Sequence, residues 1–207
     1  MKKNITRKSE EPPAFDPNHQ RYSDQPLPSY RFIPGITLHP HLKNPPQPPF
    51  VKVGGVNDET SEKDPDARRL RRRDAGVLTL VRRGATDEDN EADGLLQRFL
   101  YGIDLFNFNY WWEAHEAWET VWKTTEKTDE AGRFLQGLIQ ISAGMIKWWV
   151  GNSSGMKKLF KEGLEKLQTV STQNLMGLDL RSQIAKIQQF EENPSPEDYP
   201  FLKLTRK

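Results

Sequence analysis

The chain has 207 residues, a formal net charge of +1 and no cysteine, and its length allows one or two domains. A charge this close to zero gives no electrostatic case for nucleic-acid or membrane-surface binding, and the lack of cysteine excludes disulfides and thiolate metal sites. No apolar run approaches the roughly 20 residues of a membrane span, and the polar N-terminus lacks the apolar core of a signal peptide. We therefore expect a cytoplasmic protein without a membrane segment.

The first part of the chain, 1–65, is predicted to be a partly ordered, irregular, proline-rich arm. Twelve of the fifteen prolines lie there, and proline both lacks the backbone donor and clashes with a preceding helical turn. Apolar side chains such as Tyr22, Phe32 and Ile33 recur among these prolines. We interpret 22–53 as an extended segment that lies against a folded body, with plain disorder as the alternative.

A charged connector is expected over 66–92. Arginines cluster between Arg68 and Arg73, and an acidic block follows at 87–93. A nucleic-acid contact is one interpretation of the arginines. Solvation, or pairing with the acidic block, fits the near-zero net charge better.

A helical domain is predicted over 93–192, because apolar residues recur there at three- and four-residue intervals. Short turns between the helices imply one compact antiparallel all-α bundle, followed by an irregular tail over 193–207. The five expected helices span 93–107, 110–123, 131–150, 156–170 and 178–190.

The helix ends follow from capping chemistry. Asp93 is the predicted N-cap of the first helix, and Thr128 or Asp129 that of the third. The first helix should end near Asn109, because asparagine tolerates the left-handed conformation that terminates helices.

The expected second helix combines residue types that rarely occur together. Four tryptophans, three glutamates and one histidine fall within 110–122. At about 100° per residue, His115 lies at the centre of one face and Glu119 at its edge, one turn further on. The same face carries Trp111, Trp118 and Trp122. Because charge beside indole rings is costly unless it is paired or used, this helix predicts a site.

The expected third helix is apolar except for one stripe. Two of its glycines lie a heptad apart, which indicates close approach by another helix, and glutamine amides both donate and accept hydrogen bonds. We expect this stripe to face His115 and Glu119, with Arg133 or Gln136 satisfying the carboxylates and Gln140 meeting the imidazole. The stripe consists of Arg133, Gln136, Gly137, Gln140, Ala143, Gly144 and Lys147.

Three hypotheses fit these polar groups. In the first, they form a buried, fully hydrogen-bonded network that fixes the helix register. In the second, they line a cleft for a small molecule or a partner, with tryptophans as walls. In the third, they form a metal or catalytic site. In the last case His115 and Glu119 bind a divalent metal and Glu116 acts as base. The spacing matches neither His-Glu-x-x-His nor the Glu-x-x-His of di-iron bundles. His39 and His41 would be the arm's contribution.

The chain also contains two adjacent tryptophan pairs, Trp111–Trp112 and Trp148–Trp149. Since neighbours on a helix point in different directions, we expect at least one member of each pair near the surface. Exposed aromatic residues often mark a partner contact. The second pair is therefore a candidate docking point for a protein partner or a second copy of the chain.

Several of these residues resemble the signature of the domain-of-unknown-function family 309. The resemblance rests on Asn107, the run Trp-Glu-Ala-His-Glu at 112–116, Glu119, Trp122 and the run Phe-Leu-Gln-Gly-Leu-Ile-Gln at 134–140. It covers about 94–190 and implies a compact all-α bundle, without supplying an activity. The family's characteristic polar positions fall on Asn107, His115, Glu116, Glu119, Gln136 and Gln140.

We predict that the domain binds a small molecule or a partner in the cleft between the second and third helices. The alternatives are a metal-assisted hydrolase, whose cofactor would be a divalent metal held by His115 and Glu119, and an interaction module with a purely structural polar network. The predicted contact residues are Asn107, Trp111, His115, Glu116, Glu119, Trp122, Arg133, Gln136 and Gln140.

Overall fold

The structure is a computed structural model that describes residues 19–35, 37 and 87–205. His39, His41 and the arginine cluster of the connector lie outside the described residues. The bounds predicted for the arm and the connector are therefore not assessed as a whole.

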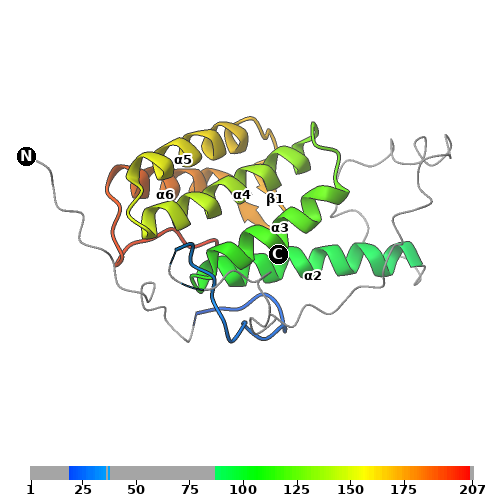
Figure 1. The fold of residues 1–207 in the computed structure, drawn as a ribbon. Coiled ribbons are helices and arrows are strands. Elements are labelled where there is room, and N and C mark those ends of the chain that lie inside the picture. Colours follow the sequence, from blue (N-terminus) through cyan, green and yellow to red (C-terminus); the bar gives the residue numbers. More distant parts are fainter. Residues whose placement is uncertain (1–18, 36, 38–86, 206–207) are drawn as a thin grey trace, which may run out of the picture.

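Within the described residues five α-helices form the predicted all-α bundle (Figure 1). Consecutive helices pack side by side, and α4 lies between α3 and α5. The helices are α2 (Asp87–Asn107), α3 (Trp111–Thr124), α4 (Glu130–Trp149), α5 (Ser153–Gln168) and α6 (Leu180–Glu192).

One helix start was predicted wrongly. The first helix of the bundle, α2, begins at Asp87 and not at Asp93. The acidic block that we had assigned to the connector therefore lies within this helix.

The predicted helix ends near the site are confirmed. Asn109 has a φ of 66°, which is the expected left-handed conformation between α2 and α3. Asp129 caps α4, because its side chain accepts a hydrogen bond from the Gly132 N–H at 2.6 Å. These two turns set the directions in which α3 and α4 start.

A short hairpin that the sequence analysis did not predict precedes α6. Strands β1 (Asn174–Leu175) and β2 (Leu178–Asp179) pair antiparallel. The two residues that join them, Met176 and Gly177, have φ values of 53° and 83°, as tight hairpin turns require.

The backbones of α4 and α5 almost touch. A Cβ atom on Gly137 would lie 3.1 Å from the Gly163 carbonyl oxygen, and a Cβ atom on Gly163 would lie 3.0 Å from the Gly137 carbonyl oxygen. One on Gly144 would overlap the Phe160 ring, 2.3 Å away. The predicted close approach to the α4 glycines is therefore correct, but the approaching helix is α5 and not α3.

Two irregular segments are fastened to the bundle by buried polar side chains. Asp104, which is 0% exposed, accepts the backbone N–H groups of Tyr22 at 2.8 Å and of Ser23 at 2.9 Å. Asn107 donates to the Leu202 carbonyl oxygen at 2.9 Å and accepts from the Leu202 N–H at 2.8 Å. These bonds satisfy backbone groups of the arm and the tail that no neighbouring strand pairs with.

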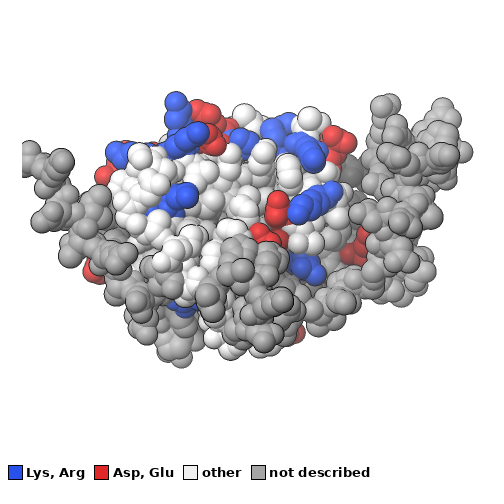
Figure 2. Space-filling view, in the orientation of Figure 1, with Lys and Arg blue, Asp and Glu red and all other residues white. Residues whose placement is uncertain are grey.

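The surface shows mixed charge. On the face in Figure 2, basic and acidic side chains lie next to one another along the upper edge, where α5 runs in Figure 1. None of the helices in the described ranges is long and apolar enough to cross a membrane.

The α4–α5 contact gives a stability prediction. The free energy of unfolding of Gly163→Ala should be about 1–3 kcal/mol lower than that of Gly94→Ala. The new Cβ at residue 163 would meet Ile141 Cδ1 at 2.9 Å, whereas a Cβ at residue 94 would have no neighbour within 4 Å among the described residues. Both are helical glycines, so the gain in helix propensity is shared. Urea denaturation measures the difference, and equal stability of the two variants would contradict the close contact.

Candidate functional site

Three side chains converge on one side of α3. A ring nitrogen of His115 and one carboxylate oxygen each of Glu116 and Glu119 lie within 4.8 Å of one another, and all three residues are half-buried. Among the described residues, no other three His, Cys, Asp or Glu side chains come this close together. We call it the His115 cluster.

The imidazole of His115 is oriented by α4. Its Nδ1 lies 3.3 Å from the Ile139 carbonyl oxygen. Because a carbonyl oxygen only accepts hydrogen bonds, this contact assigns the proton of a neutral imidazole to Nδ1 and the lone pair to Nε2. Histidine ligands of metals are commonly held in this way, with one nitrogen bonded to a backbone carbonyl and the other left for the metal.

An indole ring lies parallel to the imidazole of His115. The ring of Trp112 is stacked on that of His115, with centroids 5.9 Å apart and planes 13° apart. Trp112 also forms a T-shaped contact with the arm residue Phe32, with ring centroids 4.8 Å apart and planes at 74°. The arm is thus connected to the His115 cluster through a series of three rings.

Glu119 forms a salt bridge with Lys123, at 3.3 Å. The side chains are 32% and 64% exposed, respectively, and an ion pair this exposed typically contributes less than about 1 kcal/mol. The pair therefore does not prevent Glu119 from binding another cation.

Two residues of the polar stripe of α4, Gln140 and Arg133, have partners other than the His115 cluster, so the contacts predicted for these two residues are wrong. Gln140 Nε2 donates to Glu162 of α5 at 3.0 Å and does not meet the imidazole. Arg133 donates to the Thr128 carbonyl oxygen and does not pair with the carboxylates of α3. The cause is the glycine contact with α5, which turns this stripe towards α5. Gln136 is half-buried, one turn before Gln140.

Two further predicted contact residues belong to the packing of the bundle. Asn107 is fully buried and is bonded to the tail. Trp111 is 4% exposed and its ring lies against those of Trp148 and Trp149, at 6.0 and 6.3 Å. Trp122 is half-buried, with the Lys127 ammonium 4.9 Å from its ring centre.

The expectation that Trp148 or Trp149 lies near the surface is also wrong. They are 6% and 5% exposed. Trp148 is covered by Phe190 of α6 at 4.9 Å, and Trp149 lines a small cavity beside the arm. Their burial removes the basis for a docking point at this pair.

Glu113 has a role that the sequence pattern does not predict. This residue is 4% exposed, and its Oε1 accepts the backbone N–H of Phe32 at 2.7 Å, while Oε2 has no partner among the described residues. Burial raises the pKa of Glu113 to about 7, opposed by the Phe32 N–H and by the charge of Arg31. In the sequence, the one sign of this role is that Glu113 lies on a different face of its helix from His115.

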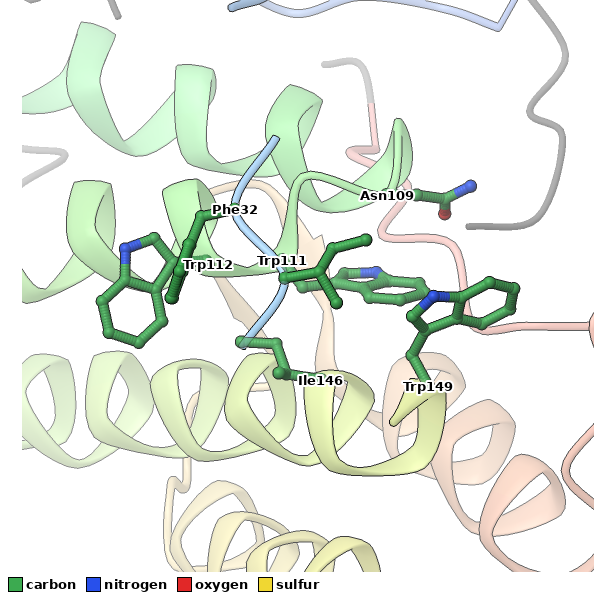
Figure 3. A pocket seen from close by; sticks show the side chains of 7 residues that line it. Phe32, Asn109, Trp111, Trp112, Ile146 and Trp149 are labelled. Carbon is green, nitrogen blue, oxygen red and sulfur yellow. The ribbon is translucent and has the colours of Figure 1, made fainter. Parts of the chain in front are cut away.

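A small cavity lies where the arm crosses α3 and α4 (Figure 3). Its volume of about 10 Å³ is room for at most about one water molecule. The arm residues Phe32 and Ile33 thus occupy the space beside the tryptophans. The lining residues are Phe32, Ile33, Asn109, Trp111, Trp112, Ile146 and Trp149.

The comparisons with known proteins agree with the family resemblance. Residues 99–159 match the family described as a domain of unknown function (DUF309). The match is shorter than the 94–190 that we predicted, and it contains the whole His115 cluster. No curated protein matches the chain.

Glu113 gives a prediction of pH dependence. The pKa of Glu113 is about 7 in the folded protein and about 4.5 when the side chain is exposed. Between pH 4.5 and pH 7, Glu113 therefore keeps its proton in the folded protein and has lost it in the unfolded chain. The free energy of unfolding should therefore fall by about 3 kcal/mol as the pH rises from 4.5 to 7. Glu113→Gln should lack this component.

Urea denaturation across this pH range, with a chelator present, measures the effect. Glu165→Gln, which changes an exposed carboxylate of α5, serves as the control. If Glu113→Gln and the wild type have the same pH profile, the carboxylate of Glu113 does not keep its proton on folding.

Proposed function

We propose that the DUF309 domain binds one divalent transition-metal ion through His115, Glu116 and Glu119. The observation that carries the proposal is the convergence of three ligand atoms within 4.8 Å, one of them on an imidazole held by a backbone carbonyl. One imidazole and two carboxylates form a ligand set suited to Mn²⁺, Fe²⁺ or Zn²⁺.

Electrostatics supports a cation at this position. Two carboxylates in close proximity repel one another, and the partner of Glu119 in the described structure is the exposed Lys123. A divalent ion between the two carboxylates would attract both of them and so offset their mutual repulsion. A purely structural network would instead be expected to bury these groups and bond them to one another.

The cleft hypothesis has less support. It placed Gln140, with Arg133 or Gln136, on the same face as His115, and both Gln140 and Arg133 have partners elsewhere. The cavity between α3, α4 and the arm is apolar in its lining and holds about 10 Å³.

Three protein ligands leave coordination positions for water, and metal-bound water is the nucleophile in metal-assisted hydrolysis. Hydrolysis of a small substrate is therefore the reaction class that this site would suit. Metal binding itself does not depend on that activity.

The test is metal binding by protein purified without a histidine tag. With Zn²⁺, Mn²⁺ or Fe²⁺ supplied in turn, we expect about one bound ion per chain, and His115→Gln or Glu119→Gln should weaken binding at least about tenfold, because each removes a ligand worth more than about 1.4 kcal/mol. Titration calorimetry measures the affinity.

His19→Gln and Glu165→Gln are the matched controls, since they change the same residue types outside the cluster. A stoichiometry near zero with all three ions would exclude the proposal. So would a His115→Gln variant with wild-type affinity.

A further inference from the structure

The arm reaches the His115 cluster through aromatic contacts. The rings of Phe32 and Trp112 form a T-shaped pair, and the indole of Trp112 is stacked on the imidazole of His115. Figure 3 shows Phe32 and Trp112 side by side where the arm passes between α3 and α4. Residues more than 80 positions apart in sequence thus contribute to one site.

The position of Phe32 is fixed on both sides. Its N–H is bonded to the buried Glu113 carboxylate. The next residue, Ile33, is 6% exposed and is hydrogen-bonded to Thr37. The Ile33 N–H donates to Thr37 Oγ1 at 2.7 Å, and the Thr37 N–H donates to the Ile33 carbonyl oxygen at 3.0 Å. The ring of Phe32 therefore meets Trp112 from a defined direction.

We infer that Phe32 is a positioning residue for the metal site, acting through Trp112 on the imidazole of His115. The inference rests on the proposed function. A single hydrogen bond to the Ile139 carbonyl leaves the imidazole free to tilt about that bond, and the stacked indole restricts this motion. Groups that orient a metal ligand from behind typically contribute 10–100-fold in metal affinity.

The first experiment requires no metal. In the metal-free protein, the ring-proton resonances of His115 report the ring current of the stacked indole. Phe32→Ala should move them towards the values found in Trp112→Ala. Tyr101→Phe, which removes a different contact between arm and bundle, the bond to the Pro26 carbonyl oxygen, should leave them unchanged.

The second experiment uses Co²⁺ as the probe, because its visible absorption reports coordination geometry. Phe32→Ala should weaken Co²⁺ binding about 10–100-fold and change the spectrum, and Tyr101→Phe should do neither. In a Trp112→Ala background, Phe32→Ala should have almost no further effect, because residues that act in series are not additive. Phe32→Leu, which keeps an apolar side chain, is the milder variant if Phe32→Ala unfolds.

The outcomes separate the two proposals. Wild-type affinity and spectrum in the Phe32 variants would overturn the positioning role while leaving metal binding intact. An undiminished effect of Phe32→Ala without Trp112 would also overturn it, since the influence would not pass through the indole. A wild-type protein that binds no metal overturns the proposed function and the metal part of this inference, and the His115 resonances then decide alone whether the arm orients the imidazole.

Discussion

The close contact between α4 and α5 determines which side of α4 faces the His115 cluster. Because Gly137 and Gly163 let the two backbones approach so closely, the rotation of α4 about its axis is fixed. Its polar stripe is directed to α5, and the opposite side meets α3, where Ser142 Oγ donates to the Trp111 carbonyl oxygen at 2.5 Å. The contribution of α4 to the His115 cluster is therefore a backbone carbonyl and not an amide side chain.

This arrangement has a chemical consequence. A carbonyl oxygen can orient an imidazole but can neither neutralise a carboxylate nor donate a hydrogen bond to a ligand. The charge of Glu116 and Glu119 thus has to be balanced from solvent, through Lys123 or through a bound cation. Among the described residues no side chain of α4 forms a salt bridge with these carboxylates, and Arg133 donates to Thr128 instead.

The parts that the sequence predicted well are those governed by neighbours in the chain. The end of α2 at a left-handed Asn109 and the Asp129 cap depend on a few consecutive residues. The proximity of His115 to Glu119 likewise follows from i, i+4 spacing within one helix. The parts that it did not predict depend on pairs far apart, such as Glu113 with Phe32 and Asn107 with Leu202, which are separated by 81 and 95 positions. Periodicity marks an apolar or polar face, but not which neighbour it meets.

The two carboxylates that hold the arm differ in how completely they are satisfied. Asp104 accepts hydrogen bonds from the Tyr22 and Ser23 N–H groups and from Ser23 Oγ, and it pairs with Arg21 at 3.4 Å. Glu113 accepts one bond from the arm and keeps one oxygen without a partner among the described residues. An incompletely bonded buried carboxylate favours its neutral form. The hydrogen bond of Glu113 to Phe32 therefore stabilises the bound arm less than the hydrogen bonds of Asp104 to Tyr22 and Ser23. Close to the site, the arm is consequently held mainly by the packing of Phe32 and Ile33 against tryptophans, and the same packing orients the ring beside His115.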